Sequence, residues 1–141
     1  MNLPPENKTL LLVEDNESYR QIVALSLGQR LPGYHIIEAD SVQSAREVLP
    51  EGLDVAVLDM TLPDGMATDI IGGWQEPMAR GLKVVVFSNY EEDEVAPGLA
   101  SVGVHRYVNK ERGIKPLVQA IQEVVAGPAA GSLPAGGTED A

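Results

Sequence analysis

The chain has 141 residues and a mass of 15.0 kDa, enough for one domain with a single core but too few for two. It contains no cysteine, which excludes disulfides and thiolate metal sites and favours a cytoplasmic location. A net charge of −11 disfavours direct nucleic-acid binding, because an acidic surface repels phosphates, and no apolar run or leader predicts a membrane partner.

The first half of the chain alternates short apolar runs with helical patterns. Residues 8–13, 34–39 and 54–59 are predicted strands, apolar in the manner of strands that are buried on both faces. Asn16 and Ser41 are expected to cap the two helices between them. The predicted apolar faces of these helices contain Tyr19, Ile22, Val23, Leu27 and Leu31 in the first, and Val42, Ala45 and Leu49 in the second.

The second half continues this alternation, with strands predicted at 83–88 and 104–110. A helix that Gly72 and Gly73 weaken is expected before the first of these strands. The acidic residues after Tyr90 favour another helix start, which Pro97-Gly98 should shorten or break. The apolar residues expected to be buried are Met66, Ile70, Trp74 and Met78 in the weak helix, and Leu117, Ala120, Ile121, Val124 and Val125 in a last helix that starts near Pro116.

Five strands that alternate with helices predict a parallel sheet covered on both faces, a three-layer α/β sandwich. The domain is expected to span residues 8–126. An amino-terminal tail at 1–7 precedes it, and residues 127–141 are interpreted as a flexible linker or tail because they are rich in Gly, Pro and Ala.

Polar side chains occur at the carboxyl ends of four predicted strands: Glu14 and Asp15, Asp59, Ser88, and Lys110. In an open parallel sheet these ends border the ligand crevice. Each residue alone has a simple explanation, since strands often end in polar loops. Together they predict one site with three acids, a hydroxyl and an amine.

Three neighbouring carboxylates repel one another by about 1 to 4 kcal/mol per contacting pair, so a cation is expected among them. Mg²⁺ suits these oxygen ligands, whereas zinc does not, because His35 and His105 lie on strands away from the cluster. Asp59 is then placed to attack phosphorus and form an acyl phosphate. Nothing in the cluster positions a second organic substrate, so the phosphoryl group is interpreted as a signal.

The ordered motifs LLVEDN, VLDMTLPDG, VVVFS and YVNK resemble those of the receiver domain of bacterial two-component response regulators. The resemblance covers about residues 8–126 and implies the flavodoxin-like, doubly wound (βα)5 fold with strand order 2-1-3-4-5. It implies that Asp59 is the phosphoacceptor. It also implies that Asp15, Asp59 and the backbone carbonyl of Thr61 bind Mg²⁺, with Glu14 assisting through water.

The resemblance also implies a switch and its partners. A phosphoryl group from a histidine kinase or phosphotransfer protein would turn Ser88 toward Asp59, and Tyr107 would change rotamer with it. Tyr107 is otherwise explained as a half-buried strand aromatic. The output surface is expected at residues 90–126, for a homodimer or an output partner, and the domain would catalyse only its own phosphoryl transfer and dephosphorylation.

Three departures from the family pattern bear on switching. Glu111 stands where many members have proline, which suggests a more mobile loop, and Asn89 replaces a small residue, which could narrow phosphate access. Pro97-Gly98 falls in the expected signalling helix. In this family the positions of Thr61 and Tyr90 tune the lifetime of the phosphoryl group.

Three alternative interpretations stay open from the sequence. The chain could be a receiver-like interaction module that does not switch by phosphorylation, or the amino-terminal part of a longer DNA-binding regulator. A phosphohydrolase with an aspartyl-phosphate intermediate is disfavoured, because such enzymes need a second acid at the position of Thr61.

Overall fold

The computed structural model describes residues 7–90 and 92–127, and only the backbone at 92–96. The predicted tails at 1–7 and 127–141 therefore lie, apart from residues 7 and 127, outside the described residues. Five parallel strands form the sheet in the order β2-β1-β3-β6-β7. Their bounds are Lys8–Val13 (β1), Tyr34–Ala39 (β2), Val55–Leu58 (β3), Lys83–Ser88 (β6) and Arg106–Asn109 (β7).

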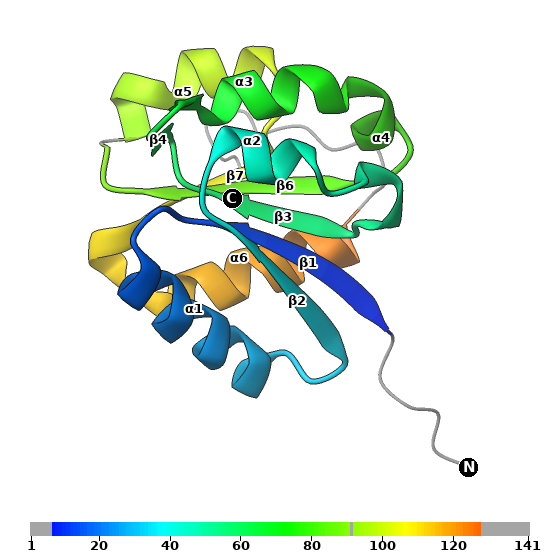
Figure 1. Cartoon of the computed structure of the whole chain (residues 1–141), viewed down its shortest axis with the longest axis vertical. Helices are drawn as coiled ribbons and strands as arrows, with labels where there is room; N and C mark the ends of the chain where they lie inside the picture. The colour runs from blue at the N-terminus through cyan, green and yellow to red at the C-terminus, as the bar shows by residue number, and fades with distance from the viewer. Residues whose placement is uncertain (1–6, 91, 128–141) are drawn as a thin grey trace.

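This order matches the predicted 2-1-3-4-5 once a short antiparallel hairpin, β4 (Thr61–Leu62) with β5 (Gly65–Met66), is left out of the count. The helices form two layers (Figure 1), and the flavodoxin-like α/β sandwich is thereby confirmed. One layer consists of α1 (Glu17–Arg30) and α6 (Ile114–Ala126). The other consists of α2 (Val42–Arg46), α3 (Ala67–Ile71), α4 (Gln75–Ala79) and α5 (Glu92–Ser101).

The core lies on both faces of the sheet because alternate side chains of each strand point to opposite layers. In β1, Leu11 and Val13 pack with α2 and α3, whereas Leu10 and Leu12 pack with α1 and α6. All four are almost completely buried, and each contributes roughly 1.5 to 3 kcal/mol of apolar burial. Burial on both faces explains why these strands are apolar throughout.

The turn after β3 is tied to helix α2 by a carboxylate. Asp64 accepts hydrogen bonds from the backbone N–H groups of Val42 (2.7 Å) and Gln43 (3.0 Å), and these bonds lower the pKa of Asp64. Glycine is favoured beside it at position 65, where φ is +157°, and a Cβ there would lie 2.7 Å from a side-chain oxygen of Asp69. The loop after Asp59 is thus fixed to a neighbouring helix.

Three predictions of buried apolar side chains are wrong. Ile22 is 58% exposed, Leu49 is 77% exposed and Met66 is 41% exposed. Ile22 lies on the outer face of α1, since Val23 and Leu27 are the residues of that helix that pack inward. Leu49 follows the end of α2, and Met66 precedes α3, so neither belongs to a helical stripe.

The predicted elements also differ in their bounds. The weak third helix divides into α3, a 3₁₀ turn at Gly72–Trp74 (η2) and α4, which agrees with the expected effect of the glycines. Helix α5 runs through Pro97 to Ser101, so the predicted break is wrong. The lost hydrogen bond is tolerated because Leu99, two residues further, is completely buried.

The last strand is shorter than predicted, since β7 ends at Asn109 and Lys110 starts a 3₁₀ turn, Lys110–Arg112 (η3). The predicted caps Asn16 and Ser41 are confirmed: each accepts the backbone N–H three residues ahead.

Among the described residues, no helix is both long and apolar enough to cross a bilayer.

Candidate functional site

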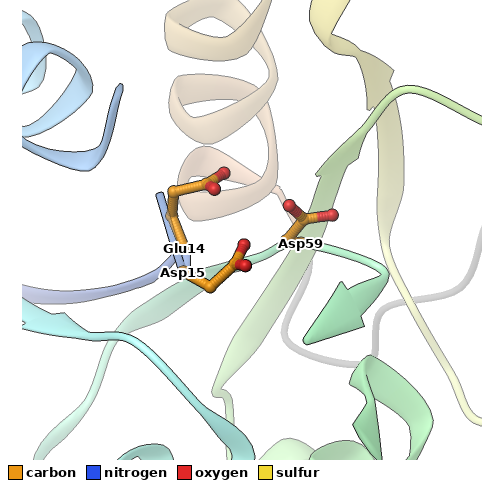
Figure 2. A group of neighbouring side chains, drawn as sticks. All are labelled: Glu14, Asp15 and Asp59. Atoms are coloured by element: carbon orange, nitrogen blue, oxygen red, sulfur yellow. The ribbon is translucent and has the colours of Figure 1, made fainter. Parts of the chain in front are cut away.

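The carboxyl ends of four strands bring the five polar residues of the predicted site together. Glu14 and Asp15 follow β1, Asp59 follows β3, Ser88 ends β6 and Lys110 follows β7. Figure 2 shows the carboxyl groups of the three acids turned toward a common space. One oxygen of each acid lies within 4.8 Å of the others. Parallel strands end at the same edge of a sheet, which explains why residues so far apart in sequence converge.

Asp59 lies at the centre of this site. Its Oδ1 accepts a hydrogen bond from the Ser88 hydroxyl at 2.8 Å, and its Oδ2 lies 2.8 Å from the Lys110 ammonium. Lys110 Nζ also contacts Oε1 of Glu14 at 2.5 Å. One lysine therefore pairs with two carboxylates, and both oxygens of Asp59 are already oriented.

The electrostatics of this group are uneven. Burial raises the pKa of the Glu14 carboxyl, because desolvation outweighs its hydrogen bonds with Lys110 and the Asn16 N–H. Burial alone would lower the pKa of Lys110, but hydrogen bonds with Asp59 and Glu14 outweigh it and raise that pKa. The difference arises because Lys110 faces two carboxylates, whereas Glu14 shares one cation with Asp59.

The three acids fit a divalent cation with oxygen ligands. Within residues 7–90 and 92–127, the exposed Asp15 carboxylate makes no hydrogen bond or ion pair, and Lys110 already pairs with the other two acids. Three carboxylates against one ammonium leave a local charge of about −2. Oxygen donors with excess negative charge suit Mg²⁺. Thr61, whose carbonyl was the fourth predicted ligand, lies beside them, with its N–H 3.4 Å from Asp59 Oδ1.

Two residues of α1 support the site and were not singled out from the sequence. Arg20 donates to the backbone carbonyl of Glu14 at 2.8 Å and pairs with Glu38 of β2 at 3.0 Å. The Tyr19 ring lies 5.0 Å from Lys110 Nζ, within the range of a cation–π interaction. The sequence does indicate that these two residues lie near the site, because their helix starts directly after the acidic pair and its first turn must lie beside those acids.

Two tyrosines connect the loops around the site. The Tyr107 hydroxyl donates to the backbone carbonyl of Ser88 at 3.1 Å and to that of Tyr90. The Tyr90 hydroxyl is hydrogen-bonded to Oγ1 of Thr61 at 2.9 Å, across the edge of the site. The structure thus brings Tyr107 next to Ser88, as the switch hypothesis requires, and adds a contact between Thr61 and Tyr90.

Both histidines lie outside this group. His35 is exposed in the edge strand β2, and His105 is buried immediately before β7. Among the described residues, the group of acids that could hold a metal ion contains neither of them. The group therefore offers oxygen ligands only.

Residues 10–122 match the family model described as the response regulator receiver domain, and the chain belongs to this family. Phosphorylation on an aspartate is the general property of the family. The chain is 31% identical over 127 residues to the response regulator GacA of Pseudomonas aeruginosa, with 84% of this chain and 55% of GacA covered. It is 32% identical over 120 residues to the DNA-binding transcriptional activator DevR/DosR of Mycobacterium tuberculosis, with 84% and 54% covered.

The fold is also that of solved receiver structures. The response regulator TrrA of Thermotoga maritima, solved in complex with Mg²⁺-BeF, has a TM-score of 0.71 and 21% identity, with 83% of this chain and 98% of TrrA covered. The chain spans about half the length of GacA and DevR/DosR. Receiver domains are generally non-enzymatic signalling domains that histidine kinases phosphorylate, and they have autophosphatase activity.

Proposed function

We propose that Asp59 is the phosphoacceptor of this receiver domain and that its donor is the phosphohistidine of a sensor kinase or a histidine phosphotransfer protein. The observation that supports this most directly is the position of the Asp59 carboxylate between the Ser88 hydroxyl and the Lys110 ammonium, each 2.8 Å away. A hydroxyl and an ammonium on either side of a carboxylate are arranged to bind the oxygens of a phosphoryl group that forms on it.

The chemistry is a transfer of phosphorus from nitrogen to oxygen. An oxygen of Asp59 attacks phosphorus, the P–N bond of the phosphohistidine breaks, and the imidazole leaves with the electron pair and takes up a proton. Lys110 neutralises charge on one phosphoryl oxygen, and Ser88 donates a hydrogen bond to another. Attack by water later cleaves the acyl phosphate to phosphate and the free Asp59 carboxylate. Beyond this turnover of its own modification, the domain is not an enzyme.

The same acids are proposed to hold Mg²⁺. Asp15, Asp59 and the carbonyl of Thr61 would be its direct ligands, and Glu14 would contribute through water. The bound ion would offset the repulsion between the acids and the incoming phosphoryl group. The complex of TrrA with Mg²⁺-BeF supports this proposal by similarity of fold.

Phosphorylation is proposed to bias the face at residues 90–126 through Ser88 and Tyr107. The Tyr107 hydroxyl bonds the carbonyls of Ser88 and Tyr90, so a change at Ser88 is transmitted to the loop that leads into α5. A second copy or an output partner would bind this face. DevR/DosR is a DNA-binding transcriptional activator of which this chain covers about half, so a receiver within a longer DNA-binding regulator is an alternative form of the proposal. Direct nucleic-acid binding by this acidic segment is not proposed.

The acceptor is tested by labelling with radioactive acetyl phosphate in the presence of Mg²⁺. Wild-type chain is expected to take up acid-stable, alkali-labile label, and Asp59→Asn to take up none. Asp54→Asn is the matched control, because Asp54 lies at the other end of the sheet, where it accepts the Thr9 N–H. This variant should be labelled to the same extent as the wild type. Label that survives Asp59→Asn would exclude Asp59 as the acceptor.

A second candidate is a receiver-like interaction module that does not switch. It is favoured by the hydrogen bonds from Ser88 to Asp59 and from Tyr107 to the Ser88 and Tyr90 carbonyls, because these bonds hold in place the two side chains that a switch would have to move. Beryllofluoride, a phosphoryl mimic, distinguishes the two. A switching receiver should show amide shift changes at Ser88 and Tyr107 that spread into residues 92–101, whereas the module should show changes only at the acids.

A further inference from the structure

Asn109 ends strand β7 immediately before Lys110, and its side-chain amide makes two separate hydrogen bonds. Its Oδ1 accepts the backbone N–H of Glu111 at 2.8 Å, and its Nδ2 donates to the backbone carbonyl of Tyr90 at 3.2 Å. One bond is local to the Lys110 turn, and the other reaches a loop 19 residues earlier in the chain. The two halves of one amide thus hold two loops of the site.

The Oδ1 bond fixes the turn that carries Lys110. Asn109 is the N-cap of the 3₁₀ turn Lys110–Arg112, and its backbone is extended where the turn begins. The capped N–H belongs to Glu111. Many receivers have a proline at this position, and a proline has no backbone N–H to donate. The cap therefore orders the Lys110 turn in this chain without that proline.

The Nδ2 bond fixes the loop that follows Ser88. The Tyr90 carbonyl accepts hydrogen bonds from both Asn109 and Tyr107, two side chains of β7 that lie two residues apart. The Tyr107 hydroxyl bonds two carbonyls of the segment Ser88–Tyr90, those of Ser88 and Tyr90. The amide of Asn109 bonds this loop and the Lys110 turn at the same time.

We propose that Asn109 is a positioning residue for phosphoryl transfer, which holds the Lys110 turn and the Ser88–Tyr90 loop at a fixed separation. The proposal rests on the function proposed for Asp59. Lys110 and Ser88 contact opposite oxygens of the Asp59 carboxylate, so both must be in place when the transition state forms. Groups held in position before the reaction lower its barrier, because they need no reorganisation during it.

The two bonds can be separated by substitution. Asn109→Ser keeps an oxygen that can accept the Glu111 N–H but has no amide to reach Tyr90, and it adds no charge. Asn109→Ala removes both bonds. Gln75→Ala is the matched control, because the Gln75 amide likewise bonds the backbone carbonyls of two elements, at Ile71 and Val102, which lie outside the site.

The experiment measures the rate of labelling by acetyl phosphate against donor concentration, the Mg²⁺ affinity by calorimetry and the melting temperature. Asn109→Ser should lower the rate at saturating donor by roughly three- to tenfold, the range for loss of one hydrogen bond, with KM and Mg²⁺ affinity unchanged. Asn109→Ala should lower the rate further, and Gln75→Ala should keep it within about twofold.

Three outcomes would overturn the proposal. A wild-type rate in Asn109→Ser would make Asn109 a helix cap alone. A parallel loss of rate, Mg²⁺ affinity and melting temperature in Asn109→Ser would make it a residue of general structural importance. Absence of label on the wild-type chain would instead refute the function proposed for Asp59, and the role of Asn109 with it.

Discussion

The two ends of the parallel sheet both contain buried or half-buried charged groups, but they use them differently. At the carboxyl end, Asp59, Glu14 and Lys110 are bonded to one another through side chains. At the amino end, Asp54 accepts the backbone N–H of Thr9 at 2.8 Å, and His105 accepts that of Val84 at 3.0 Å. Side chains bonded to backbone hold strands in place, whereas side chains bonded to each other leave a group of charges that a ligand can rearrange.

The two ends also differ in how well their polar groups are paired. At the amino end, Asp54 and His105 each accept a backbone N–H, although Nε2 of His105 is buried without a hydrogen-bond partner among the described residues. At the carboxyl end, Glu14 and Asp59 share one ammonium, Asp15 lies beside them without an ion pair among the described residues, and burial raises the pKa of Glu14. An arrangement that leaves negative charge uncompensated is unfavourable for the fold alone, and the proposed Mg²⁺ would offset it.

The first prediction compares the half-buried Lys110 with the buried Lys83. Lys110→Met should lower labelling of the chain by acetyl phosphate at least about 100-fold, because it removes a cation that contacts the reacting carboxylate. Lys83→Met, at the amino end, should change the labelling rate by less than about twofold. Comparable losses in both variants would show that the two ends do not differ in function.

An intermediate effect concerns stability and pH at the amino end. Burial and the nearby Lys83 hold the pKa of His105 below its ordinary value. As the pH falls below about 6.5, the unfolded chain takes up a proton at His105 that the folded chain does not. The free energy of unfolding should therefore decrease, by up to about 1.4 kcal/mol per pH unit for this one proton.

The dependence of the free energy of unfolding on pH can be measured by urea unfolding at a series of pH values, followed by the fluorescence of the buried Trp74. His105→Asn is the control, since its Oδ1 can accept the Val84 N–H and does not titrate, and its slope between pH 6.5 and 5 should be smaller. The raised pKa of Glu14 acts in the opposite sense, because there the folded chain binds the proton first. An unchanged slope in His105→Asn would exclude His105 as the origin of the acid sensitivity.

The smallest expected effect is at the exposed edge of the carboxyl end. Tyr90→Phe removes the hydroxyl that bonds Thr61, and water should then reach the acyl phosphate more easily, so the phosphoryl lifetime should shorten by about twofold. Thr61→Val should have the same effect. The double variant should add nothing, because both changes remove one bond, and additive effects would show that the two side chains act separately.

Much of the fold could be predicted from local patterns. Apolar runs and helical spacing located all five strands of the main sheet, and Asn16 and Ser41 were identified as caps because capping depends on residues three apart. The exposure of Ile22 and Leu49 could not be predicted, because it depends on where a helix ends and which side faces the sheet. The continuation of α5 through Pro97 depends likewise on tertiary packing, at Leu99.

Local patterns in the sequence were enough to identify the polar groups of the proposed site and the strands that place them at one edge of the sheet. These groups are Glu14, Asp15, Asp59, Ser88 and Lys110. The hydrogen bonds and ion pairs that connect these groups depend on the tertiary structure. The roles of Arg20, Tyr90 and Asn109 depend on bonds to backbone carbonyls and side chains of other elements. Such partners depend on packing in three dimensions, so local spacing in the sequence does not predict them.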